Sequence, residues 1–159
     1  MTMKPKKPLT KEEALLTMAG LCARSEQCAG DIARKLAARG LAPGDVAFVI
    51  EELERRGFID LRRFAAAFAR DKVRFSAWGR RKISASLAAK RIPSSIVSET
   101  LAQIPADDYA EAVSRAARAK ASALNLEVYA DCVKLYRHLL SRGFESEIAS
   151  GQIRKLRGK

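Results

Sequence analysis

Residues 32–41, IARKLAARGL, return as residues 83–92, ISASLAAKRI, and again as residues 135–144, LYRHLLSRGF. Each copy begins with an apolar residue, has a leucine four residues later and closes on another apolar residue. A spacing of four residues is close to one turn of an α-helix, so the first two positions share one face. Gly40 and Gly143 precede the closing apolar residue and are typical of the left-handed turn that ends a helix. One helical segment therefore occurs three times.

The repeat continues downstream of these segments. The corresponding apolar positions are Val46 and Leu53 in the first copy, Val97 and Ile104 in the second, and Ile148 and Leu156 in the third. The first two copies are offset by 51 residues throughout, and the third is shifted by a further residue or so. A unit of this length cannot bury its apolar face alone, so neighbouring units stack. We expect an all-α fold of three tandem three-helix repeats in an elongated, curved arrangement.

Helix start and stop signals place individual helices. The pair Thr10 and Glu13 forms a capping box and predicts a helix over residues 11–24. Pro43 fits the first turn of another helix, which Gly57 ends.

The same signals divide the chain into four expected parts. Residues 1–9 form a disordered basic tail, and residues 10–58 form the first three-helix repeat. Residues 59–105 form a second, strongly basic repeat, and residues 106–159 form the third. Pro105, followed by two acids, marks the last boundary.

The net charge of +12 is concentrated in the second repeat. Residues 62–91 contain ten basic residues and a single acid, Asp71, whereas both flanking parts are nearly neutral. Such an excess suits a polyanion or a strongly acidic protein surface as the partner.

Four aromatic residues are interleaved with these cations: Phe64, Phe68, Phe75 and Trp78. Rings in a basic patch can stack on nucleobases while the cations contact phosphates. Burial is the competing interpretation, and we favour it for Phe64 and Phe68, which lie four residues apart on an alanine-rich helix. Phe75 and Trp78, in or beside a loop, are more open, although burial remains the expectation for them too.

The sequence offers little for catalysis or metal binding. His138 is the only histidine, so a histidine-based triad or a histidine-rich metal site is not expected. Cys22, Cys28 and Cys132 lack paired zinc spacing and are interpreted as reduced packing residues. We expect no enzyme activity, cofactor or metal, and a cytoplasmic protein without a membrane segment.

Two groups of charges are interpreted as structural. Arg63 follows Asp60 by three residues and directly precedes Phe64, which is typical of an ion pair at a helix junction. The acids Glu51, Glu52 and Glu54, next to Arg55 and Arg56, are typical of a solvated helix face with local ion pairs.

Motif residues spread over residues 10–156 point to a known family. They are Ala37, Ala38, Arg39 and Gly40; Arg56, Gly57, Phe58, Ile59, Asp60, Arg63, Phe64 and Ala65; Gly79, Arg81, Lys82, Ile83, Leu87, Lys90 and Ile92; and Lys134, Tyr136, Arg137, Leu140, Arg142, Gly143, Phe144 and Ile148. In this order and spacing they resemble the RecX family of recombinase regulators. Cys28, Leu61, Ser86 and Arg91 depart from the family pattern, and the last two make the second repeat more basic.

The resemblance implies tandem repeats that bind the RecA recombinase and its filament on single-stranded DNA. It implies modulation of RecA ATPase and strand exchange, with inhibition expected, in recombination, DNA repair and the SOS response. Double-stranded DNA is left open as a further partner, and we expect a monomer. From the charge map, the expected contact residues are Arg62, Arg70, Lys72, Arg74, Arg80, Arg81, Lys82, Lys90 and Arg91.

Two other functions remain open. A helix-turn-helix-like protein would bind DNA directly, but residues 82–89 offer no Asn or Gln for bidentate base contacts. A structural module unrelated to DNA would tolerate neutralisation of the second repeat.

Overall fold

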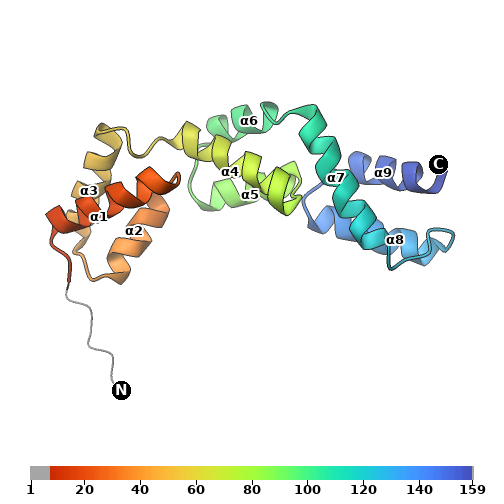
Figure 1. Cartoon of the computed structure of the whole chain (residues 1–159), viewed down its shortest axis with the longest axis horizontal. Helices are drawn as coiled ribbons and strands as arrows, with labels where there is room; N and C mark the ends of the chain where they lie inside the picture. The colour runs from red at the N-terminus through yellow and green to blue at the C-terminus, as the bar shows by residue number, and fades with distance from the viewer. Residues whose placement is uncertain (1–7, 159) are drawn as a thin grey trace, which may run out of the picture. The chain divides into compact units, whose positions relative to one another are not determined.

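The computed structural model describes residues 8–158, which form nine α-helices and no strand. The helices are α1 (Lys11–Arg24), α2 (Ala29–Ala38), α3 (Pro43–Arg55), α4 (Leu61–Ser76), α5 (Arg80–Ala89), α6 (Ser94–Ala102), α7 (Ala106–Ala121), α8 (Tyr129–Ser141) and α9 (Ser146–Gly158) (Figure 1). The expected all-α repeat fold is confirmed. We call α1–α3, α4–α6 and α7–α9 the first, second and third triplets.

None of the helices in residues 8–158 combines the length and apolarity needed to cross a bilayer.

The described residues form two compact units, which divide between Phe64 and Ala65 and which we describe separately. Most of the expected tail, residues 1–9, lies outside the described residues, and the boundaries at 58/59 and 105/106 remain predictions.

The first unit is built around the first triplet. Helix α3 packs against both α1 and α2, and its Val49 and Leu53 are fully buried with Ile32 and Leu36 of α2. The Thr10 hydroxyl accepts a hydrogen bond from the backbone N–H of Glu13 at 3.1 Å, so the predicted cap at the start of α1 is present. Apolar faces at helical spacing therefore close a small core.

The segments that repeat in sequence also end in the same geometry. Gly40, Arg91 and Gly143 have φ angles of +83°, +62° and +95°. The backbone N–H groups of the next residues, Leu41, Ile92 and Phe144, donate to the carbonyls of Leu36, Leu87 and Leu139 at 3.2, 3.1 and 3.1 Å. This is the hydrogen bond of a Schellman cap, and all three apolar residues after it are buried. Arg91 thus adopts the left-handed conformation that its glycine counterparts adopt.

One position of the third copy was assigned wrongly. Ile148 was expected to correspond to Val97, but its side chain is 37% exposed, whereas the neighbouring Ala149 is fully buried. The caps of the second and third copies, at Arg91 and Gly143, are offset by 52 residues, which places Ala149 opposite Val97. The prediction chose Ile148, the larger apolar residue, whereas the structure buries the smaller Ala149.

The second unit holds a direct backbone contact between two glycines, in the α4–α5 and α8–α9 loops. Gly79 donates its N–H to the carbonyl of Arg142 at 2.8 Å, and Arg81 donates to the carbonyl of Gly143 at 2.9 Å. The Arg142 guanidinium also donates to the carbonyl of Ser76. A Cβ atom on Gly79 would lie 2.3 Å from the Gly143 carbonyl carbon, so only glycine fits. We call this the Gly79–Gly143 contact. It joins the second and third triplets.

Replacing Gly79 with alanine should destabilise the protein by about 1–3 kcal/mol, because the new methyl group meets backbone that cannot rotate away. Thermal unfolding measures the effect. Gly151→Ala is the matched control in the same unit, because a Cβ there makes only an ordinary contact at 3.7 Å, and alanine favours helix α9. Equal stability of the two variants would show that the loops separate without cost.

Arg91→Gly should raise stability by about 1 kcal/mol, because glycine adopts positive φ without steric strain. The matched control is Arg137→Gly, which removes the same charge from an exposed position inside α8 and should lower stability by about 1 kcal/mol. Shifts of the same sign in chemical denaturation would contradict a strained Arg91.

Candidate nucleic-acid interface

Two aromatic rings meet at the end of α4 in the second unit. The backbone N–H of Trp78 donates to the Lys72 carbonyl at 3.0 Å, which folds the chain back over the last turn of α4. The turn passes through Ala77, whose φ is +51°. The Trp78 ring then packs edge to face on Phe68, with ring centroids 6.3 Å apart and an interplanar angle of 72°.

Three lysine ammonium groups lie over these two rings. Lys72 Nζ is 4.6 Å from the Trp78 centroid and 5.4 Å from the Phe68 centroid. Lys82 Nζ is 4.5 Å from Trp78, and Lys90 Nζ is 5.9 Å from Phe68. These five half-buried residues form what we call the lysine–aromatic cluster. Cation–π attraction holds the ammonium groups over the rings, and because neutral rings do not cancel the charge of Lys72 and Lys82, the cluster is suited to an anion.

All four aromatics were expected to be buried, and one of them is. Phe64 is buried, as predicted, whereas Phe68 and Trp78 are only half-buried. Phe75 was expected to be buried, but it is 82% exposed. Phe68, Lys72 and Phe75 follow the i, i+4, i+7 spacing, so Phe75 continues the cluster's face of α4. The sequence contains this spacing, but the spacing of Phe64 and Phe68 was used instead, and it predicted a buried helix face.

Arg70 and Arg74 lie on the opposite face of α4. They border a groove of about 240 Å³ whose floor includes Ala69 and Val73. Arg74 Nη2 is 3.2 Å from an Asp108 carboxylate oxygen, and Arg70 Nε is 3.5 Å from one of Asp71. The structure therefore does not bring these two arginines to the lysine–aromatic cluster.

Arg80 belongs to a network between the second and third triplets. Its Nη1 is 2.9 Å from Glu145 Oε2, and its guanidinium carbon is 3.8 Å from the Tyr109 ring centroid. The Tyr109 hydroxyl donates to the same carboxylate and accepts the backbone N–H of Arg80 at 3.1 Å. Burial, followed by the hydrogen bond to Glu145, raises the pKa of Tyr109 far above its ordinary value, so the phenol stays protonated. Neither Tyr109 nor Glu145 was expected in the site, because no local sequence pattern links them to Arg80.

The remaining expected contact residues are placed as follows. Arg81 and Arg91 are exposed and adjoin Lys82 and Lys90 in the chain. Arg62 is exposed at the start of α4, within the first unit. Of the nine, the structure gathers Lys72, Lys82 and Lys90 around one pair of rings.

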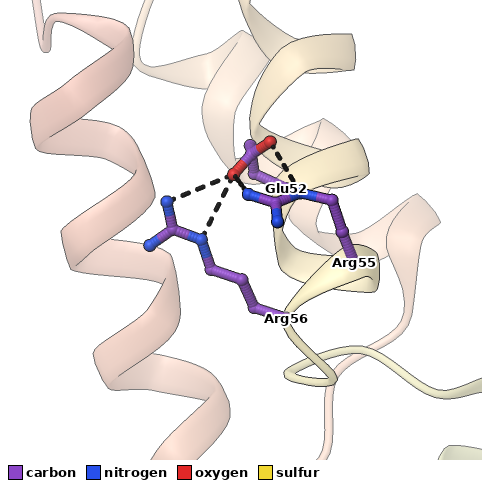
Figure 2. Close-up of polar contacts among 3 residues, drawn as sticks. All are labelled: Glu52, Arg55 and Arg56. Atoms are coloured by element: carbon purple, nitrogen blue, oxygen red, sulfur yellow. Dashed lines mark hydrogen bonds and ion pairs between the residues drawn. The ribbon is translucent and has the colours of Figure 1, made fainter.

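Of the charges interpreted as structural, Glu52 forms the expected local ion pairs, whereas Arg63 forms an ion pair with a residue far away in the sequence and not with Asp60. Arg63 Nε is 2.6 Å from Glu26 Oε1, and Asp60 accepts the Arg63 backbone N–H at 2.9 Å, so the side-chain partner is Glu26. Figure 2 shows Glu52 between Arg55 and Arg56, with shortest N–O distances of 2.6 and 3.2 Å. The hydrogen bond from Arg55 is the main reason that the pKa of Glu52 is lowered.

The described residues contain no group of three or more His, Cys, Asp and Glu side chains able to hold a metal ion. Cys28 is buried, and Cys22 and Cys132 are partly buried, which fits packing residues. Burial is also the main cause that lowers the pKa of His138.

Comparisons with known proteins agree on one family. The model of the second three-helix domain of RecX matches residues 62–101. The regulatory protein RecX of Pelodictyon phaeoclathratiforme is 32% identical over 142 residues, covering 89% of this chain and 85% of that relative. The regulatory protein RecX of Halorhodospira halophila is 35% identical over 92 residues, covering 58% of this chain and little more than half, 56%, of that relative.

Solved structures share the fold. A crystal structure of RecX from Lactobacillus salivarius has a TM-score of 0.76 at 18% identity and covers 94% of this chain and 97% of its own. Another, of regulatory protein RecX, has a TM-score of 0.74 at 20% identity and covers 88% of this chain and 70% of its own.

The Arg80 network generates a prediction about stability. Arg80→Ala should destabilise the protein by about 1–2 kcal/mol, because it leaves the Glu145 carboxylate without its cation and removes a cation–π contact. Arg81→Ala removes the same charge from an exposed neighbour and should change stability by less than about 0.5 kcal/mol. Thermal unfolding compares the two. A larger loss for Arg81→Ala would overturn the structural role of Arg80.

Proposed function

This chain belongs to the RecX family of regulatory proteins, and on that basis we propose that it binds the RecA recombinase and its nucleoprotein filament and inhibits RecA ATPase and strand exchange. Its setting would be recombination, DNA repair and the SOS response. We propose that it works as a cytoplasmic monomer and not as an enzyme. RecA itself and filament-bound DNA are the proposed partners.

The observation that carries this proposal is the lysine–aromatic cluster. Its three ammonium groups lie in the stretch 62–91, which has ten basic residues and one acid. A filament on single-stranded DNA presents a regular row of phosphates, and multiple lysines bind such a row through counterion release. We propose Lys72, Lys82 and Lys90, with the exposed Arg81 and Arg91, as its principal contacts.

Arg74 and Arg80 each pair with an acid of the third triplet. We propose that Arg80 has a structural role through its contacts with Tyr109 and Glu145. We propose that Arg74 and Arg70 contribute to the groove on the other face of α4 and not to the lysine–aromatic cluster. Arg62 remains a proposed contact near the junction of the two units.

Direct sequence reading of duplex DNA is the less supported alternative. Helix α5 offers serines but no Asn or Gln, and the guanidinium of Arg80 at its start is engaged by Glu145. Contacts to phosphates fit these side chains better than contacts to base edges.

The decisive experiment adds the protein to RecA on single-stranded DNA and measures ATP hydrolysis and strand exchange. The variant Arg81→Gln/Lys82→Gln/Arg91→Gln should lose at least tenfold in inhibitory potency, because three proposed phosphate contacts disappear.

The matched control is Arg34→Gln/Arg55→Gln/Arg56→Gln. It removes the same net charge from exposed residues of the first unit that pair locally with Asp31 and Glu52. It should retain inhibition, since surface ion pairs contribute little to stability. No effect of the unmodified protein on RecA would refute the proposed function, and equal loss in both triple variants would refute the assignment to the second triplet.

A further inference from the structure

We propose that Phe75 stacks on an unpaired nucleobase while the lysine–aromatic cluster beside it binds the adjoining phosphates, so that this face of α4 selects single-stranded over duplex nucleic acid. The inference rests on the proposed function only in taking nucleic acid as the polyanion. It adds the recognition of bases to the contact with phosphates.

Phe75 is exposed where the chain is most basic. The residue is 82% exposed at the end of α4, one helical turn beyond Lys72 and two beyond Phe68. An apolar ring in water gains nothing for the fold, so a ligand that covers it would gain the burial. Tyr129 is equally exposed, at 83%, but it begins α8 between Glu127 and Asp131, outside the basic stretch.

The spacing of these groups suits one nucleotide and its neighbours. Residues 72 and 75 are three apart on a helix, about 4.5 Å along its axis. A base on the Phe75 ring therefore has its phosphates close to the Lys72 side chain. Lys82 and Lys90, held by the rings of Trp78 and Phe68, extend the cationic surface from that point.

Stacking on an exposed ring requires a base that is not already stacked and paired in a duplex. Aromatic platforms beside cations are the usual means of binding single strands, and they tolerate any sequence because every base has a flat face. Phosphate contacts alone would favour the duplex, whose charge density is higher. A preference for single strands over duplex is therefore the expected result if Phe75 stacks on bases.

The test measures binding without RecA. Trp78 is the only tryptophan in the chain and part of the cluster, so its emission reports binding at this site. Affinities come from anisotropy of three labelled probes at one fixed salt concentration: oligothymidylate, an abasic strand of the same length and a duplex of the same length. We expect oligothymidylate to bind most tightly and to change the Trp78 emission.

Phe75→Ala should weaken oligothymidylate binding about 5- to 100-fold and leave the abasic strand unaffected, because only the stacking contact is lost. Phe75→Tyr should restore binding, and Phe75→Leu should not. Tyr129→Ala is the matched control, since it removes an equally exposed ring from the same unit and should bind as the unmodified protein does. Circular dichroism of each variant verifies the helical fold.

Several results would overturn the inference. The first is equal affinity for abasic and intact strands, the second is unchanged affinity of Phe75→Ala for oligothymidylate, and the third is tighter binding of the duplex. The fourth is a Phe75→Ala variant that loses affinity for polyglutamate as well as for oligothymidylate, which would indicate an acidic protein as the partner. Failure of the proposed function is separate: a protein that prefers single strands through Phe75 but leaves RecA unaffected would refute RecA regulation alone.

Discussion

The backbone contact between Gly79 and Gly143 is the constraint on which the geometry of the second unit depends. A Cβ atom on Gly143 would lie 2.4 Å from the Cβ of Lys82, so the start of α5 is held against the α8–α9 loop. The same contact places Arg80 over Tyr109 and beside Glu145. Because Lys82 is fixed there, its ammonium group reaches Trp78. The proposed binding face therefore depends on the third triplet, although all its residues belong to the second.

Much of the fold was predictable because its signals are local. The first helix begins and ends where the capping box and the apolar spacing placed it, at Lys11–Arg24. Two of the three repeated segments end at a glycine in the left-handed conformation, and the buried leucines fall at the expected positions. Arg91 stands where the other two copies have glycine and adopts the same left-handed conformation, so its backbone follows the neighbouring copies and not the ordinary preference of an arginine.

The candidate site was predictable only as a charge map. The ion pair of Arg80 joins residues 65 positions apart, and that of Arg74 joins residues 34 apart, so no local pattern reveals either partner. Lys72 and Lys82 both lie over Trp78 because a left-handed Ala77 turns the chain back and brings that ring to Phe68. The prediction for Phe75 was wrong because it relied on the usual burial of large aromatic rings, and that tendency takes no account of binding partners.

The lysines that rest on Phe68 and Trp78 have a thermodynamic consequence for any anionic ligand. A solvated lysine loses rotamer freedom when it binds a phosphate, and this loss of entropy costs about 0.5–1.5 kcal/mol of binding free energy per side chain. Here Lys72 and Lys82 lie 4.5–4.6 Å from the Trp78 centroid, so part of that entropy is already lost on folding. The cluster is in this sense preorganised, and complex formation begins with side chains near their bound positions.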